Sequence, residues 1–415
     1  MRSPLFLGVL VALLTPAGAL AQRADLPPSE KVAEALDNHP AVAAARARVD
    51  AARADRDMLA KGIHEIAVTG SYVRRSVDRE GGYDEFDATI ARPFRLPGKA
   101  ALDREAGALG IEVAENRMED ARHQTALLLS GYWNDWLVAG ALYRNDLDTV
   151  RWLEKELSAL RRRVALRDAA ALDVDQAMAA LAQAQAQVAS SLAAREQARV
   201  TLAANFPEIP LPTEPPETSV AMVPAQKLAA MRDLVIERSH EIRAAEREAQ
   251  RLAVVARRVR ADRIADPSFG VRLFSERSGM EQGAGVVMSM PLGGGHRRAA
   301  ADRASAEGNA AQLEHMSVQR TVRAIADADL SSATLRLEAW KNTDLSAQSA
   351  ASALARTERG YQLGQIDLAD LLYARRQAGE ARRSEIMARS EAARALLKLE
   401  IDSHSLWVVH DEDGG

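Results

Sequence analysis

The feature that most constrains the fold of this chain is a stretch of about 60 residues, Ala100–Leu160, that contains no proline. At about 1.5 Å per residue, a continuous helix of this length would be on the order of 90 Å long. Such a helix does not fit an ordinary globular domain, and it indicates a coiled coil or a spanning tube. Aromatic residues make up only 4% of the chain, whereas alanine and arginine are abundant. The composition therefore predicts long helices packed through small side chains rather than an enzyme core.

A similar order of sequence patterns occurs twice, at an offset of roughly 200 residues. Each copy has an Ala/Arg-rich helix, two segments without helical periodicity, a proline–glycine turn, a very long helix, a break and a closing helix. The breaks fall near 166–168 and 363–365. We therefore divide the chain into a signal peptide (1–21), a first repeat (22–206, with a hairpin at 64–96), a Pro-rich linker (207–224), a second repeat (225–403, with a hairpin at 266–292) and a tail (404–415). In the closing helix of the first repeat, a 3–4 spacing predicts a coiled-coil seam at Met178, Leu181, Gln185, Val188 and Leu192.

The segments without helical periodicity are predicted to be β-strands. They are His64–Arg75, Asp84–Leu96, Asp266–Arg277 and Gln282–Leu292. Each is about as long as one membrane-crossing strand, and apolar residues such as Phe269, Val271 and Leu273 alternate with other residues. Gly81-Gly82 and Ser278-Gly279 are predicted to form the hairpin turns. Four strands leave unpaired edges in lipid, so the pattern predicts an oligomer, and three copies would supply twelve strands.

The first residues have the pattern of a secretory signal peptide. Arg2 supplies a positive charge, residues 5–14 are apolar, and Ala19-Leu20-Ala21 resembles a cleavage site. We therefore expect export from the cytoplasm. The chain contains no cysteine, so we expect neither disulfides nor a lipid anchor on a cysteine after the cleavage site.

Taken together, these features resemble the TolC-type outer-membrane efflux family over essentially the whole chain after residue 21. The turns at 93–99 (PFRLPGK) and 291–295 (PLGGG) are similar to the strand-to-helix turns of that family. The first is most like the heavy-metal branch, the CzcC/CusC type. A third stretch, 360–372, resembles the tip motif of the family. The candidate turn residues are Pro93, Pro97, Gly98, Pro291, Gly293 and Gly294.

The resemblance implies a mainly α fold with a small β-barrel. Long antiparallel coiled-coil helices would form two repeats, each with one β-hairpin, and a homotrimer would close a twelve-stranded barrel and an α-helical tunnel. The protein would lie in the cell outer membrane, contact its lipid and extend into the periplasm. It would be the passive exit duct of a tripartite efflux system, conducting metal cations or drugs from an inner-membrane pump, of RND type, through a periplasmic adaptor protein. No enzymatic activity and no cofactor are implied.

The tip motif contains residues with a local structural role and an implied role in the pore. Gly364 is predicted to end a helix, and Asp367 to cap the next one. The resemblance implies that Asp370 faces the pore, where three copies would form a carboxylate ring that favours cations. It also implies that Asp173 holds the tip closed through a hydrogen bond to Tyr361.

The chain departs from the family pattern at two tip positions. Tyr373 stands where the best-known member has a second pore acid, and Ile366 where it has an arginine. A double acidic ring is therefore not expected.

A duct for type I protein secretion and a periplasmic helical scaffold remain as alternatives. The eight histidines show neither an HExxH motif nor an i, i+4 pair, so no zinc site is predicted. The net charge of −4 gives no support for nucleic-acid binding. Arginine runs such as 161–163 indicate a solvated helix face. Two interpretations are open for Met280, Met288 and Met290, namely packing in the barrel or binding of soft cations.

Overall fold

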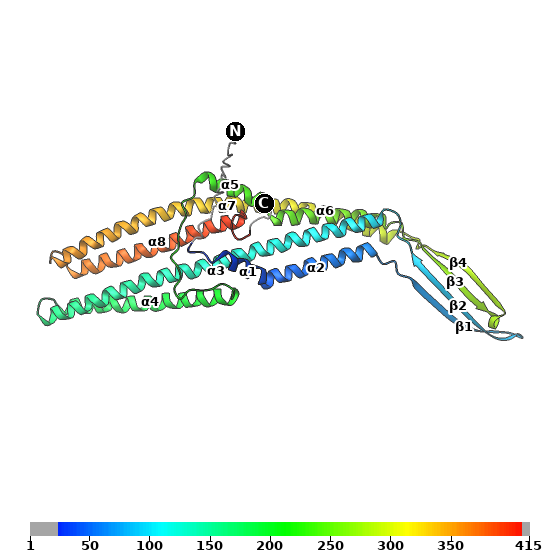
Figure 1. The fold of residues 1–415 in the computed structure, drawn as a ribbon, viewed down its shortest axis with the longest axis horizontal. Helices are drawn as coiled ribbons and strands as arrows, with labels where there is room; N and C mark the ends of the chain where they lie inside the picture. Colours follow the sequence, from blue (N-terminus) through cyan, green and yellow to red (C-terminus); the bar gives the residue numbers. More distant parts are fainter. Residues whose placement is uncertain (1–23, 409–415) are drawn as a thin grey trace, which may run out of the picture.

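The structure is a computed structural model that describes residues 24–408, so the predicted signal peptide and residues 409–415 of the predicted tail lie outside the described residues. The molecule is a long rod with a β-sheet at one end and two helical turns at the other (Figure 1). Both ends of the described chain lie near the middle of the rod.

The same order of elements occurs in both halves of the described chain. The first half contains α1 (Ser29–Asn38), α2 (Pro40–Lys61), β1 (Ala67–Val77), β2 (Gly81–Pro93), α3 (Lys99–Ala165) and α4 (Ala171–Asn205). The second half contains α5 (Ala225–Glu237), α6 (His240–Ala261), β3 (Ser268–Glu276), the short 3-10 helix η1 (Arg277–Gly279), β4 (Glu281–Ser289), α7 (Gly295–Gln362) and α8 (Leu368–Asp402). Residues 206–224, between the halves, form neither helix nor strand.

The second helix of each half begins at a side-chain cap. The His39 side chain accepts a hydrogen bond from the Ala41 N–H at 3.3 Å, and Pro40 occupies the first helical position, where a missing N–H costs nothing. In the second half, Ser239 Oγ accepts from the Ile242 N–H at 3.2 Å. These caps fix the points at which α1 ends and α2 begins, and at which α5 ends and α6 begins.

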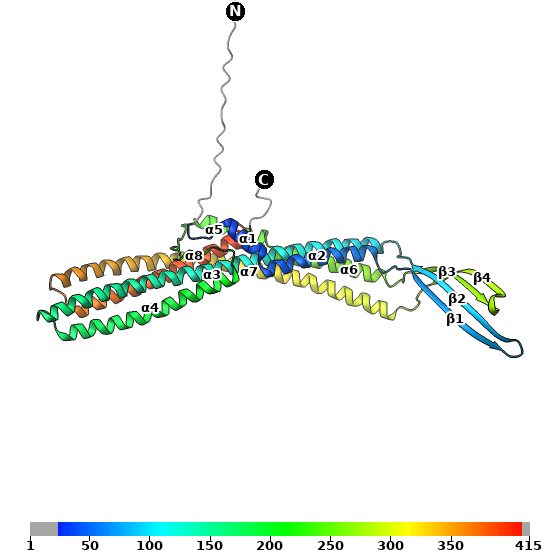
Figure 2. The same ribbon diagram turned by 60° about the horizontal axis from the view of Figure 1, so that its bottom comes forward.

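Two uninterrupted helices run the length of the rod. α3 has 67 residues and α7 has 68, so each is about 100 Å long. In the half nearer the sheet, α2 packs on α3 and α6 packs on α7, whereas in the other half α4 returns along α3 and α8 returns along α7 (Figure 2). α3 also contacts α6 and α8, which joins the two halves of the chain. The predicted mainly α fold of long antiparallel helices with a small sheet is confirmed.

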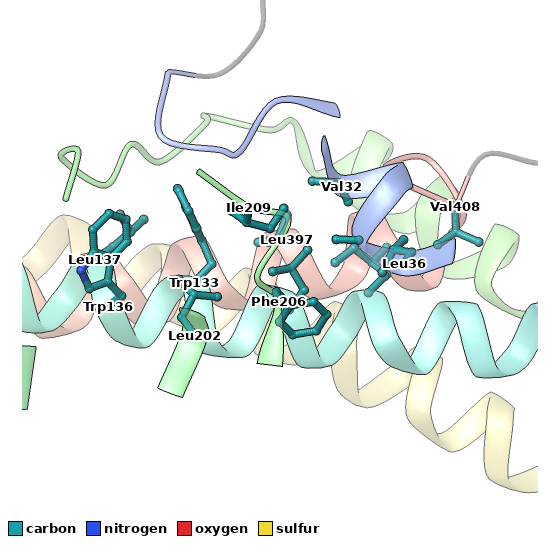
Figure 3. Packing of buried hydrophobic residues seen from close by; sticks show 14 residues of the cluster. Val32, Leu36, Trp133, Trp136, Leu137, Leu202, Phe206, Ile209, Leu397 and Val408 are labelled. Carbon is teal, nitrogen blue, oxygen red and sulfur yellow. The ribbon is translucent and has the colours of Figure 1, made fainter. Parts of the chain in front are cut away.

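An apolar core lies at mid-length, where α1, α3, the end of α4 and the end of α8 converge (Figure 3). Trp133 and Trp136 are 3% and 1% exposed, and Phe206 and Leu36 are fully buried beside them. The Trp133 indole N–H donates to the carbonyl oxygen of Asp25 at 2.8 Å. Both tryptophans therefore serve as packing residues. Further apolar clusters join α5, α7 and α8, and fill the space between the helices near the tip.

The strands form an antiparallel sheet in the order β1-β2-β3-β4, so β2 and β3 join the two halves. Their ends differ from the predicted ones by up to three residues. The first hairpin turn is formed by residues 78–80 rather than by Gly81-Gly82, which begins β2. Arg79 takes the left-handed conformation (φ 69°), and the Glu80 N–H donates to the Val77 carbonyl at 3.1 Å. The turn therefore closes before the glycines. The second turn includes Ser278-Gly279, as predicted.

Residues 24–408 include no helix that combines the length and the apolar character needed to span a membrane.

A buried ammonium group holds the turn between β2 and α3. Lys99 is only 2% exposed, and its Nζ donates to the Ile264 carbonyl oxygen and to Asp266 Oδ1, both at 2.8 Å. It also lies 2.9 Å from an oxygen of Asp262. Asp266 Oδ1 accepts a further hydrogen bond from the Leu96 N–H at 2.9 Å. One side chain of the first half thus joins its strand-to-helix turn to the segment that links α6 to β3.

The Asp266 carboxylate is strongly stabilised in its ionised form. Burial alone would raise its pKa, but hydrogen bonds from Lys99, the Leu96 N–H and His64 outweigh burial and lower the pKa to about 2. The ordinary pKa of the group is 3.8. Its contribution to stability is therefore complete above about pH 4 and is lost as the pH falls toward 2.

A second ion-paired group lies beside the first. Asp103 is 6% exposed and binds Arg95 Nη1 at 3.1 Å and Arg258 Nε at 2.7 Å. Arg95 lies over Gly62, whose φ is 69° and at which an added Cβ would stand 1.7 Å from Arg95 Nη2. We call Arg95, Lys99, Asp103, Arg258, Asp262 and Asp266 the junction network. It fixes the direction in which the sheet leaves the helices.

We expect Lys99→Met to lower the free energy of unfolding by about 3 kcal/mol, because it leaves two carboxylates in the junction network without their ammonium partner. The matched control is Lys155→Met, which removes an exposed ammonium from the same helix and should change the free energy by less than about 0.5 kcal/mol. Denaturant unfolding of the purified full chain measures both. Equal effects of the two substitutions would contradict the role of the network.

Candidate functional site

Alternation along the strands gives the sheet an apolar face and a polar face. Val271 of β3 lies opposite Ile90 of β2, and Leu273 lies opposite Ala88, so apolar side chains of neighbouring strands lie side by side. The large apolar residues of this face are Val68, Tyr72, Phe86, Ile90, Phe269, Val271, Leu273, Val286 and Met288. Each of them is between 42% and 82% exposed. An apolar surface of this extent indicates contact with lipid or with another apolar surface.

The opposite face of the sheet carries polar and charged side chains. Arg75 forms an ion pair with Glu85 at 2.7 Å. Arg272 forms an ion pair with Asp87 and also lies 5.4 Å from the centre of the Phe274 ring. These pairs join neighbouring strands across the face. The arrangement suits a surface in contact with water.

The positions of Met280, Met288 and Met290 bear on whether these residues pack in the barrel or bind soft cations. Met288 lies opposite Phe269 on the apolar face and is 65% exposed. Met290 directly follows β4, and Met280 directly follows η1. The position of Met288 favours apolar packing at the face of the sheet. Within residues 24–408, no three His, Asp or Glu side chains are grouped so that they could hold a metal ion.

The predicted strand-to-helix turn residues lie at the junction of sheet and rod. Pro93 is the last residue of β2, and Gly98 directly precedes α3 with a φ of 88°. In the second half, Gly293 has a φ of 99° and Gly294 directly precedes α7. The positive φ values favour glycine at one position in each of the two turns, one residue before α3 and two residues before α7. Pro97 and Pro291 stand in the same two turns.

The two helical turns at the other end of the rod have the same backbone geometry. Arg167, after α3, has a φ of 61°, and Gly364, after α7, has a φ of 70°. The N–H of each donates to a carbonyl three residues back, at 2.9 and 3.0 Å. The preceding leucines, Leu166 and Leu363, are 79% and 67% exposed. The rod therefore presents two matched turns with exposed apolar residues at its tip.

The tip acids cap the helices that follow these turns. Asp367 Oδ1 accepts a hydrogen bond from the Asp370 N–H at 2.8 Å, so the predicted cap of α8 is confirmed. The Asp370 carboxylate is exposed in the first turn of that helix. In the matching place of the first half, Asp173 Oδ2 accepts from the Ala170 N–H at 3.2 Å. Asp370 and Asp173 therefore both lie in the first turn of a helix, near the positive end of its dipole.

Tyr361 joins the two halves at the tip. Its hydroxyl accepts a hydrogen bond from Arg163 Nη1 at 3.0 Å, and Arg163 Nε donates to Asp168 at 2.9 Å. Burial, followed by the carboxylates of Glu156 and Asp173, raises the pKa of Tyr361 to about 12, against the opposing effect of Arg163. The phenol is therefore neutral at physiological pH and remains a hydrogen-bonding group.

Sequence reasoning missed several of these contacts. It assigned Arg163 to a solvated arginine run, whereas the structure brings it onto a tyrosine 198 residues away. It also missed Asp146 on α3, which is 6% exposed and accepts from Arg383 of α8 at 2.9 and 3.0 Å. Nearby, Arg375 lies 5.1 Å from the centre of the Trp152 ring. Because the partners come from different repeats, no local pattern in the sequence identifies these contacts.

No protein-family model matches the sequence, and none of the curated proteins compared with it matches. Solved structures do match. The outer-membrane channel OprN aligns at 19% identity with a TM-score of 0.75, over 92% of this chain and 90% of that one. The CmeC outer-membrane channel of Campylobacter jejuni aligns at 14% identity and 0.72, over 93% and 87%. CusC, described as forming a transmembrane channel, aligns at 16% identity and 0.73, over 90% and 91%.

These alignments cover nearly all of both chains. Identities this low bear on the fold, and the similar TM-scores favour none of the three channels. The chain therefore has the TolC-type fold of outer-membrane channels that the sequence resemblance predicted.

Proposed function

We propose that this protein is the outer-membrane exit duct of a tripartite efflux system. The observation that carries the proposal is a sheet with one apolar and one polar face, placed at the end of a helical rod about 100 Å long. A membrane strand needs one face for lipid and one for water. The rod is long enough to extend far into the periplasm. Solved outer-membrane channels have the same fold.

The sheet becomes a closed barrel when three copies assemble. Among the described residues, no strand pairs with the outer edge of β1 or of β4. Unpaired backbone groups are not tolerated in lipid, so each edge pairs with the opposite edge of a neighbouring copy. Four strands from each of three copies give a barrel of twelve. In this arrangement the polar face, with Asp87 and Arg272, lines the water-filled interior.

The rod carries apolar residues that one copy leaves exposed. On α7, Leu313, Leu335 and Leu345 are 66%, 66% and 64% exposed. On α4, Leu172 and Val200 are 63% and 56% exposed. Contacts between neighbouring copies bury such residues and close the helices into a tunnel. The homotrimer is therefore part of the proposal.

The tip closes the tunnel and meets the partner proteins. Three copies of Asp370 form a carboxylate ring that favours cations, and Asp173 and Tyr361 hold the closed state together. Gly364 provides the left-handed turn that exposes the neighbouring leucine. A periplasmic adaptor docks on these turns and connects the duct to an inner-membrane pump of the RND type. Metal cations or drugs then pass through the duct passively, and no enzymatic step or cofactor is involved.

Two alternative functions are kept. A duct for type I protein secretion would use the same barrel and tunnel, and differs only in pump and cargo. A periplasmic helical scaffold is less well supported, because it gives no reason for a sheet whose apolar side chains are 42% to 82% exposed. The same proposal includes the export signal at 1–21, the repeats at 22–206 and 225–403, and the linker between them.

Asp173→Ala should raise the conductance of the isolated trimer in planar lipid bilayers. The substitution removes the carboxylate that binds the Ala170 N–H and lies near Tyr361, and so loosens the tip. The matched control is Asp175→Ala, which removes an exposed carboxylate two residues along the same helix. Unchanged conductance of Asp173→Ala would exclude this residue from the gate.

Barrel closure predicts a specific cross-link between β1 and β4 of different copies. The chain has no cysteine, so Thr69→Cys on β1 can be combined with Gly285→Cys or Val287→Cys on β4, all on the polar face. One of these pairs should form a disulfide-linked trimer on a non-reducing denaturing gel, because directly opposed Cβ atoms come within about 5.5 Å. Thr69→Cys with Val286→Cys, whose side chains lie on opposite faces, is the control. Covalent dimers without trimers would contradict a closed three-fold barrel.

The cargo is tested by comparing a strain that lacks this protein with its parent. We expect greater sensitivity of the deletion strain to zinc, cobalt, cadmium, copper or silver, because the first strand-to-helix turn resembles the heavy-metal branch. Complementation with the wild-type chain should restore growth. Complementation with Lys99→Met should not restore growth if that variant fails to assemble. Sensitivity to dyes, detergents and antibiotics alone would instead identify a multidrug duct. Loss of a secreted protein from the medium would identify the type I alternative.

A further inference from the structure

A cluster of titratable side chains lies at mid-length, where α3, α6, α7 and α8 meet the C-terminal residues 403–408. It lines or adjoins a cavity of about 300 Å³. Asp329, Asp402, His240 and His404 are all between 1% and 8% exposed. We call this group the mid-rod cluster, and its members are Asp120, His123, His240, Glu241, Asp329, Lys398, Asp402 and His404.

Within the cluster, one ammonium group binds two buried carboxyl groups. Lys398 Nζ donates to the two oxygens of Asp329 at 2.8 and 2.7 Å and to Asp402 Oδ2 at 2.5 Å. Asp329 belongs to α7 and Asp402 ends α8. Two buried carboxylates with one cation between them carry an excess negative charge, which is costly in a poorly solvated site. A proton held by one of the two carboxyl groups removes that cost.

The geometry indicates which carboxyl group holds the proton. Asp402 is bound by His123 at 2.8 Å in addition to Lys398, so its ionised form is the better stabilised. Burial would raise the pKa of Asp402, but the bonds from His123, Asp329 and Lys398 lower it to about 2. Burial and the neighbouring Asp402 raise the pKa of Asp329 to about 6, despite Lys398. Asp329 is therefore the protonated partner in acid.

Other charged and titratable groups face this pair from each adjoining element. The His404 ring lies 5.2 Å from that of His123 on α3 and 5.0 Å from that of His240 on α6. Burial, followed by Asp120, raises the pKa of Glu241. Arg238 donates to the carbonyl oxygens of residues 403 and 404, both at 3.5 Å. Any test of Asp329 must therefore include a variant of a neighbouring histidine, such as His404.

We propose that the mid-rod cluster is a pH-sensitive switch, in which a proton shared by Asp329 and Asp402 holds the C-terminal segment 398–408 against α3, α6 and α7 in acid, and its loss toward neutral pH weakens that contact. The proposal is independent of the channel function, because its groups lie within one chain and at a distance from both sheet and tip.

The direction of the effect follows from the raised pKa of Asp329. A group whose pKa is about 6 when buried and 3.8 ordinarily keeps its proton in the closed segment and loses it when the segment opens. Its stabilisation is complete below about pH 4 and is lost as the pH rises to about 6. Over this range the opening equilibrium should shift toward the open form about tenfold per pH unit, or about 100-fold in all, and then level off. The change due to Asp402 lies below pH 4.

Amide hydrogen exchange of residues 398–408 in the purified full chain tests the proposal between pH 4 and pH 7.5. After correction for the pH dependence of the exchange chemistry itself, protection in the wild type should fall about tenfold per pH unit up to about pH 6. Asp329→Asn should make protection independent of pH in this range. Asp302→Asn, which changes an exposed carboxylate on the same helix, should keep the wild-type slope.

A second variant keeps the proposal testable if Asp329→Asn does not fold. Lys398→Met removes the cation that lowers the pKa of both carboxyl groups. The pH range in which protection falls should therefore extend above pH 6. Three results would overturn the proposal. The first is wild-type protection that does not change between pH 4 and pH 6, and the second is an unchanged pH dependence of protection in Asp329→Asn. The third is loss of this pH dependence in His404→Asn with its retention in Asp329→Asn. The last result would assign the pH dependence to the histidines.

Discussion

The packing of α3 against both halves of the chain is the interaction on which the rest of the structure depends. This helix contacts α2 and α4 of its own half and α6 and α8 of the other. Its buried side chains include small ones, such as Ala126 and Ala139, which let neighbouring helices approach closely, and large ones, such as Trp136, which fill the space between them. Because α3 is continuous over 67 residues, a bend in it would move the sheet and the tip relative to each other.

Apolar packing of this kind is not directional, and it would tolerate sliding of one long helix along another. Polar contacts between the halves prevent such sliding at several heights of the rod. Lys99 binds Asp266 at the junction, and His123 binds Asp402 at mid-length. Nearer the tip, Arg383 binds Asp146, and at the tip itself Arg163 binds Tyr361. Each contact joins a residue of the first half to one of the second, so together they fix the register of the two repeats.

The sequence predicted the features that depend on local patterns. Helix length follows from the absence of proline, and the breaks after α3 and α7 follow from turn residues such as Gly364. The predicted seam of α4 was partly wrong, because Met178 is 45% exposed and the buried positions are occupied by small residues such as Ala177 and Ser191. Small side chains carry little periodic signal. The cross-repeat contacts were not predictable, since their partners are 167 to 279 residues apart and ion pairs leave no pattern along one helix.

A single chain buries many apolar residues of the rod, but it leaves the apolar face and the outer edges of the sheet uncovered. The rod has apolar cores of its own, with residues such as Leu36, Leu129 and Leu399 fully buried. The sheet has none, because its apolar face is exposed and its outer edges lack a partner strand within the described chain. Within one chain, therefore, the helical part buries apolar cores and the sheet does not. The junction network then has a specific role, since Lys99 and Asp266 join the ends of β2 and β3 to the helices by contacts within one chain.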